Sequence, residues 1–124
     1  IAAAKLGYSP VAAFDFDPDC VRVATENAAL NDVSKQLVPR EADITKVPRK
    51  SKERYDLVCA NLIYDLLSAE RDRILARVAV GGSLVLAGIL ETQFAAVRKA
   101  FADAGWKLIR AKTEKEWRSG LFRA

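Results

Sequence analysis

Apolar positions along the chain fall into short continuous runs separated by helical patterns. The first run, Val11–Phe14, is apolar at every position. Such a run is typical of a strand in a parallel sheet that is covered on both faces. Asp17 and Pro18 follow as a helix-start signal, because the carboxylate accepts from free first-turn amides and proline loses no hydrogen bond at the first helical position. Residues 11–31 therefore predict a strand, a turn and a helix.

The rest of the chain continues this alternation. Further strands are predicted at Gln36–Arg40, Tyr55–Leu62, Ser83–Ala87, Trp106–Ala111 and Trp117–Arg123. Helices are predicted at Asp65–Ala79 and Thr92–Ala104, after the closing turns of another at Ile1–Leu6. Strands separated by helices pair in parallel, whereas the last two strands have no helix between them and should pair antiparallel. The predicted fold class is α/β, a doubly wound Rossmann-like arrangement with a mostly parallel sheet and one antiparallel final strand.

Asp15 stands where the first strand ends. In open α/β sheets, ligands bind in the crevice at the carboxyl ends of the strands, and a carboxylate there can accept from both hydroxyls of a ribose. The alternative is that Asp15 only starts the turn, and the stretch alone leaves both interpretations open. Asp17 is interpreted as a helix cap, because capping accounts for it fully.

The segments Phe14–Pro18 and Ala24–Asn31, at their spacing, resemble the corresponding unit of the PrmA family. Its members are S-adenosylmethionine-dependent methyltransferases that act on a large-subunit ribosomal protein. Two further segments, Cys59–Ile63 and Gly81–Leu90, also resemble the family pattern. One departure is Ala87, which stands where the family has serine, so a hydroxyl is absent there.

The resemblance implies a role for each candidate site residue. It implies that Asp15 binds the ribose of the cofactor, that Asp43 accepts from the adenine amino group and that Ile44 packs on the adenine ring. It implies that Asn61 is the catalytic residue, which accepts from the substrate nitrogen and also contributes to the cofactor site. From the residues themselves, Asp43 also fits as a cap for the segment that starts at Thr45, and a turn residue after a strand is the favoured interpretation of Asn61.

The resemblance implies methyl transfer from S-adenosylmethionine to an amino nitrogen of a protein. Because the family acts on a ribosomal protein, the resemblance also implies that the substrate is a ribosomal protein. The protein would supply proximity and orientation rather than a strong base. The alternative is a cofactor-less methyltransferase-fold remnant that acts as a binding module. A nicotinamide-dependent oxidoreductase would also use an acid on ribose, but the antiparallel final pair and the Ala60–Leu62 strand end disfavour it.

The amino-acid composition limits the kinds of site and of catalysis that we expect in this protein. The 124 residues, 51% apolar, suit a single domain with a core. No apolar run is long enough to span a membrane, and the start lacks the features of a signal peptide, so we expect a cytoplasmic protein without membrane association. The two cysteines, Cys20 and Cys59, stand apart and histidine is absent. We therefore expect no metal site and no histidine-based catalysis, with both thiols in or near the core.

Charge is uneven along the chain. Residues 1–62 carry nine basic and nine acidic side chains, and residues 63–124 carry eleven and seven. The densest basic run is Lys46–Arg54, between two predicted strands. A solvated loop is the simpler interpretation of this run. The alternative is a surface that meets RNA or an acidic partner.

The predicted order of elements begins inside a helix. A doubly wound fold starts with a strand and a glycine-rich turn that approaches the ligand, and residues 1–124 contain neither this first strand nor this turn. We therefore expect residues 1–124 to be a single methyltransferase catalytic domain that is incomplete at its amino-terminal side. It is either a fragment of a longer protein or a domain that has lost its cofactor loop.

Overall fold

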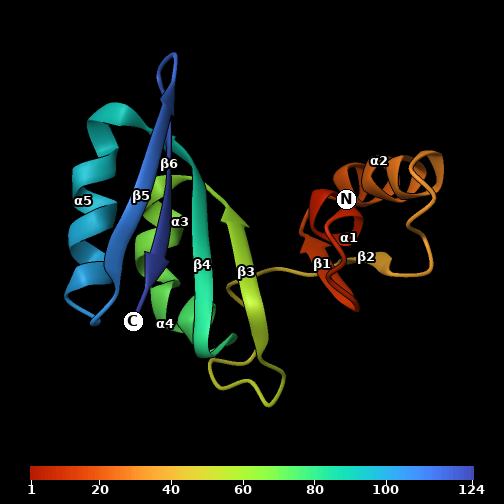
Figure 1. Ribbon diagram of the computed structural model, residues 1–124, viewed down its shortest axis with the longest axis horizontal. Coiled ribbons are helices and arrows are strands. Elements are labelled where there is room, and N and C mark those ends of the chain that lie inside the picture. The colour runs from red at the N-terminus through yellow and green to blue at the C-terminus, as the bar shows by residue number, and fades with distance from the viewer. The chain divides into compact units, whose positions relative to one another are not determined.

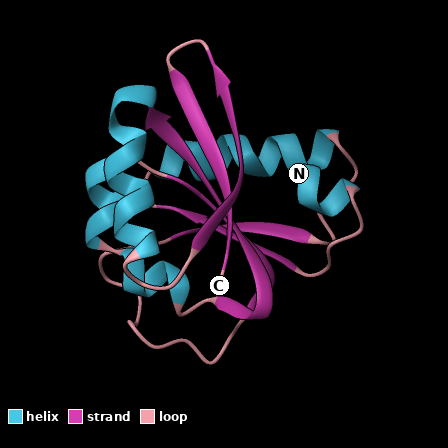
Figure 2. Ribbon diagram, turned by 60° about the vertical axis from the view of Figure 1, so that its left-hand side comes forward, coloured by secondary structure: helices cyan, strands magenta, loops and turns pink.

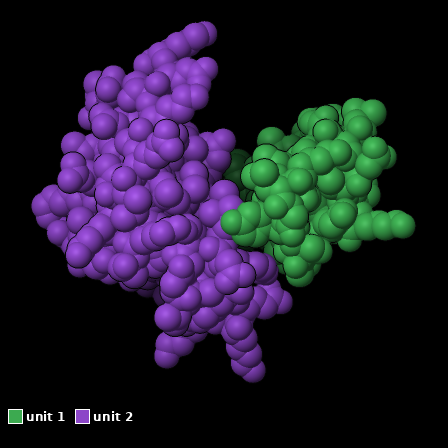
Figure 3. Space-filling view, viewed as in Figure 1, with its two compact units in different colours: residues 1–47 green, residues 48–124 purple.

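The computed structural model describes residues 1–124, which form two compact units, residues 1–47 and residues 48–124 (Figure 3). Each unit has its own sheet and is described by itself. The prediction that residues 1–124 are a single domain stays a prediction.

The first unit contains a two-stranded parallel sheet and two helices (Figure 1). Its elements in chain order are α1 (Ala2–Lys5), β1 (Val11–Asp15), α2 (Pro18–Leu30) and β2 (Leu37–Glu41). A small core lies between the helices and the sheet; its buried members are Ala4, Ala28, Val33 and Leu37. Strand β2 pairs only with β1, which explains how Pro39 is accommodated, since proline cannot donate to a second neighbour.

Strand β1 departs from the prediction in its burial. Val11 and Ala13 pack against the core, but Phe14 is 38% exposed and Ala12 is exposed as well. Burial on both faces was therefore the wrong expectation, because β1 in this unit has a core on one side only. The helix start is confirmed: Asp17 caps α2 by accepting from the amide of Asp19 at 2.9 Å.

The second unit contains a four-stranded mixed sheet with helices on one side (Figure 2). Its elements in chain order are β3 (Tyr55–Asn61), α3 (Tyr64–Ala69), α4 (Arg71–Leu75), β4 (Val78–Leu90), α5 (Glu91–Ala102), β5 (Lys107–Glu114) and β6 (Trp117–Arg123). The strand order is β3-β4-β6-β5; β3 and β4 are parallel, and β6 is antiparallel to both of its neighbours. The α/β class and the reversed final strand are confirmed, whereas a single doubly wound sheet stays a prediction.

The core of this unit lies between α5 and the sheet. Phe122 of β6 is fully buried, and its ring lies 5.9 Å from that of Phe101 and 6.5 Å from that of Phe94, centroid to centroid. The tilted geometry of both pairs is favourable for aromatic rings. Helix α5 therefore holds β6 in place, and β6 in turn pairs with the edge strand β5.

The predicted helix Asp65–Ala79 is confirmed as helical up to Leu75, but it is interrupted once and its last four residues are not helical. The helix is interrupted at Glu70, α4 ends at Leu75, and Val78 already belongs to β4. Val78 is buried and pairs with Tyr55 across the sheet. The pairing with β3 therefore overrides a sequence pattern that also suits a helix, because this contact joins residues far apart in the chain.

The final hairpin is longer than predicted. Strand β5 continues to Glu114, so only a two-residue turn remains before β6, where a longer charged connection was expected. Both cysteines are free and exposed, and the expectation that they lie in or near the core was wrong. None of the helices is both long and apolar enough to cross a membrane.

Candidate functional site

The carboxylate of Asp15 lies at the end of β1 and is exposed. Its Oδ1 accepts from the amide of Asp17 at 3.0 Å, while Oδ2 makes no hydrogen bond. The backbone carbonyl of the same residue accepts from the amide of Ala42 at 2.9 Å, so the two strand ends are tied together. The turn to α2 thus orients Asp15 and leaves one carboxylate oxygen available.

Asp43 follows β2 and holds a local turn. Its Oδ1 accepts from the amide of Thr45 at 2.9 Å and from the hydroxyl of Thr45 at 2.8 Å. Its Oδ2 lies 3.6 Å from Nζ of Lys46. These donors, the amide first, hold the pKa of Asp43 below its ordinary value. Asp43 therefore does stabilise the turn that begins at Thr45, as the alternative interpretation proposed. Adenine binding by Asp43 stays a prediction.

Ile44 is buried, with 8% of its surface exposed. Most of this side chain is already covered by protein, so only its edge is available to a ligand. Asp15 and Asp43 lie at the carboxyl ends of adjacent parallel strands, with Asp15 opposite Glu41 in the ladder. The structure thus brings both predicted acids, Asp15 and Asp43, to the same edge of the sheet. Ile44, the other residue predicted for the cofactor site in this unit, contributes packing there.

Asn61 belongs to the second unit, where it is the exposed last residue of β3. It pairs with Ala87 of β4, and the amide of Leu62 donates to the Ala87 carbonyl at 3.3 Å. Gly88 follows with φ +76°, a backbone conformation that residues with a Cβ rarely adopt. A Cβ at Gly88 would meet Oδ1 of Asn61 at a distance that real contacts do not reach, so this glycine makes room for the asparagine side chain.

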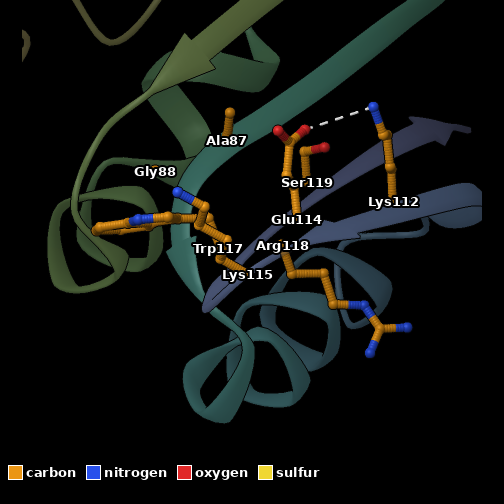
Figure 4. Close-up of a pocket in the computed structure, with 8 residues that line it drawn as sticks. All are labelled: Ala87, Gly88, Lys112, Glu114, Lys115, Trp117, Arg118 and Ser119. Carbon is orange, nitrogen blue, oxygen red and sulfur yellow. Dashed lines mark ion pairs between the residues drawn. The ribbon is translucent and has the colours of Figure 1, made fainter.

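A groove of about 340 Å³ opens beside Gly88 (Figure 4). The hairpin of β5 and β6 supplies most of its lining, and the full set is Ala87, Gly88, Lys112, Glu114, Lys115, Trp117, Arg118 and Ser119. In Figure 4 the Trp117 indole and the Lys112 ammonium lie at opposite ends of the groove. Sequence reasoning did not place these hairpin residues at a site. The available signal was the alternation along β6, which puts Trp117 and Ser119 on one face.

Neither cysteine is activated as a nucleophile. Desolvation raises the pKa of the Cys20 thiol, and the carboxylates of Asp17 and Asp15 raise it further. Desolvation likewise raises the pKa of Cys59. Both side chains are therefore thiols at neutral pH, and a thiolate mechanism has no support here. No group of three or more histidine, cysteine, aspartate or glutamate side chains is arranged to hold a metal ion.

Comparison with known proteins identifies one family over almost the whole chain. The family model described as "Ribosomal protein L11 methyltransferase (PrmA)" matches residues 1–123. A ribosomal protein L11 methyltransferase of Geotalea uraniireducens (strain Rf4) is 40% identical over 123 residues, which cover 99% of this chain and 38% of the relative. The chain thus spans about two fifths of the length of the curated relatives it matches.

Solved structures show the same fold. A ribosomal protein L11 methylase from Lactobacillus delbrueckii subsp. bulgaricus matches with a TM-score of 0.85 at 23% identity, over 98% of this chain and 62% of the other. An RNA methyltransferase from Salinibacter ruber in complex with S-adenosyl-L-homocysteine matches with a TM-score of 0.64 at 15% identity, over 89% of this chain and 62% of the other. At these identities the likeness establishes the α/β methyltransferase-like fold.

Proposed function

The chain belongs to the ribosomal protein L11 methyltransferase (PrmA) family, and on that premise we propose that it forms part of an S-adenosylmethionine-dependent methyltransferase that modifies a protein amino nitrogen. The relatives' names favour a ribosomal protein, L11, as the substrate. The observation that carries the proposal is the placement of Asp15 and Asp43 at the carboxyl ends of two adjacent parallel strands. This is the edge of an open α/β sheet at which ligands bind.

The residues of the first unit fit the nucleoside half of the cofactor. The free Oδ2 of Asp15 and the remaining acceptor capacity of Oδ1 suit the two hydroxyls of a ribose. Asp43 is held as a carboxylate by Thr45, and its Oδ2 faces only the distant Lys46 ammonium, so it can accept from an amino group. Ile44 would offer the edge of its side chain to the adenine ring.

The residue proposed to act on the substrate is Asn61. When bound, the cofactor supplies an electrophilic methyl group on a sulfonium. The amide oxygen of Asn61 would accept an N–H of the substrate amine and direct the nitrogen lone pair toward that methyl group. The excess proton on the methylated nitrogen would pass to water, and S-adenosylhomocysteine would be the other product. Asn61 thus contributes orientation and not basicity, because an amide does not titrate.

The location proposed is the cytoplasm, where a ribosomal protein would be encountered. The experiment that tests the function is calorimetric titration of S-adenosylhomocysteine into this chain and into the chain extended by the corresponding upstream segment of a family member. Asp15→Ala is the test variant. Asp19→Ala is the matched control, because it is also an exposed acid close to the same turn.

We expect binding that Asp15→Ala weakens about tenfold or more and that Asp19→Ala leaves unchanged, since a charge-assisted hydrogen bond contributes about 1.5–3 kcal/mol. Equal weakening by both substitutions would argue against a ribose contact at Asp15. Absence of binding in both forms of the protein would contradict the methyltransferase proposal and favour a cofactor-less binding module.

A further inference from the structure

The net charge of the protein resides in its final hairpin. Residues 106–124 carry six basic and two acidic side chains, whereas the rest of the chain carries 14 of each. The hairpin therefore accounts for the whole formal charge of +4. A charge excess confined to 19 residues is a local electrostatic feature and not a property of the whole composition.

The strand register sorts these charges onto one face. Phe122 points into the core beneath α5, so its neighbours along β6, Leu121 and Arg123, point to the other side. We call this the outer face. Because opposite residues of a ladder share a face, the register assigns its members, which are Lys107, Arg110, Lys112 and Glu114 of β5 and Trp117, Ser119, Leu121 and Arg123 of β6.

The cations of the outer face are poorly neutralised. Lys107 and Arg123 are exposed and stand directly opposite each other, an arrangement of like charges that destabilises a sheet. Neither of them makes an ion pair, and neither does the exposed Arg110; Arg123 donates to the hydroxyl of Ser83 at 3.1 Å. Lys112 alone has an acidic partner on this face, Glu114, at 3.5 Å. A bound polyanion would relieve this repulsion.

Large apolar side chains are exposed among these cations. Trp117 is 49% exposed, and Ile109, which bulges out of the β5 ladder, is 56% exposed. The indole also lines the groove of about 340 Å³ together with Lys112 and Ser119 of the same face. A cationic track with an exposed aromatic ring is the arrangement that proteins use for single-stranded nucleic acids, whose phosphates meet the cations while the bases stack.

We propose that the outer face of the β5–β6 hairpin binds single-stranded nucleic acid. The inference goes beyond the methyltransferase function and does not depend on it. The segment Lys46–Arg54 is a weaker candidate, because Lys46 already approaches Asp43 and Arg54 donates to the carbonyl of Val78 at 3.1 Å. Regularly spaced phosphates also suit side chains that recur every second residue along a strand, about 7 Å apart.

The test is fluorescence anisotropy with a labelled oligouridine of about 12 nucleotides, a length within the range that such surfaces occupy. The hairpin variant is the triple substitution Lys107→Glu, Arg110→Glu, Arg123→Glu. The matched control is the triple substitution Arg49→Glu, Lys50→Glu, Lys52→Glu, which changes the net charge equally in the same unit. Circular dichroism melting of all three proteins checks that the fold is retained.

We expect the parent chain to bind in the micromolar range at about 50 mM salt. The hairpin variant should bind at least about tenfold more weakly, with a log–log salt dependence reduced by about 2, because three phosphate contacts are lost. The control should bind like the parent. Equal losses in both variants, or a loss in the control alone, would overturn the assignment to the hairpin.

Trp117 provides a test that does not alter charge. Trp117→Ala should weaken binding about fivefold or more, and Trp117→Phe should largely retain it, because a ring is needed for stacking. If Trp117→Ala retained full affinity, the oligouridine would be held by charge alone, and the proposed binding mode with stacked bases would be overturned. Tighter binding of polyglutamate than of oligouridine would overturn it in favour of an acidic polypeptide partner.

Discussion

Asn61, at the end of β3, and Gly88 of β4 share one small space, because a Cβ built on the glycine would clash with the amide oxygen of the asparagine. Gly88 has φ +76°, and a Cβ built there would also lie 3.0 Å from the carbonyl oxygen of Leu62. The residue proposed to orient the substrate is thus itself positioned by the absence of a side chain on the adjacent strand.

Gly88→Ala should therefore destabilise the second unit and displace Asn61. We expect a cost above the roughly 1–3 kcal/mol of a strained backbone conformation, because the steric clash adds to the strain. Denaturant unfolding followed by tryptophan fluorescence reports on this unit, since Trp106 and Trp117 both belong to it. Gly105→Ala is the matched control, with φ +87° and no atom within 4 Å of the added Cβ. Equal costs would show that the contact with Asn61 is unimportant.

Asn61→Ala should slow methyl transfer while the fold stays intact. The exposed side chain supports no buried contact, so we expect unfolding free energy to change little, within about 0.5 kcal/mol. Loss of orientation should reduce the rate about a hundredfold. Mass spectrometry of an amine-bearing protein substrate measures the rate, and Asn27→Ala on α2 serves as the control. An unchanged rate would exclude Asn61 as the positioning residue.

Thr45→Ala should raise the pKa of Asp43 toward its ordinary value, because the hydroxyl donor is lost while the amide of residue 45 remains. In the parent the folded pKa is depressed. The turn therefore contributes stability above the unfolded pKa of about 3.9, and this contribution disappears as the pH falls through the folded pKa. Carbon-13 NMR titration of the carboxyl group measures the shift. Thr113→Ala, in the hairpin of the other unit, should leave the pKa of Asp43 unchanged, and an equal shift in that variant would contradict the local cause.

Phe122→Ala should cost about 3–5 kcal/mol, because the fully buried ring fills the space between Phe94 and Phe101. Val80→Ala, at a fully exposed position of β4, should change stability by less than about 0.5 kcal/mol. Urea denaturation with the same tryptophan readout compares the two. Similar losses would mean that α5 does not anchor the hairpin in the way described.

Local signals in the sequence were sufficient where neighbouring residues decide the structure. Asp17 and Pro18 predict the start of α2, and the structure confirms both the helix and its cap. Strand β6 was predicted with the bounds it has, Trp117–Arg123, because its start follows directly on the charged residues Lys115 and Glu116. The resemblance of residues 14–31 to one family was likewise a matter of short-range pattern, and the family model confirms it.

Contacts between residues that are distant in the chain decided the features that the sequence did not predict. The entry of Val78 into β4 depends on Tyr55, and the space around Asn61 depends on Gly88, residues that are distant in the chain. The outer face of the hairpin also required the register, since a bulge at Ile109 shifts which β5 side chains face outward. The sequence by itself determined most of the elements, the family and the candidate acids, because these rest on adjacent residues. Only the tertiary structure decided the groove beside Gly88 and the gathering of cations on one face, because strand pairing sets which side chains become neighbours.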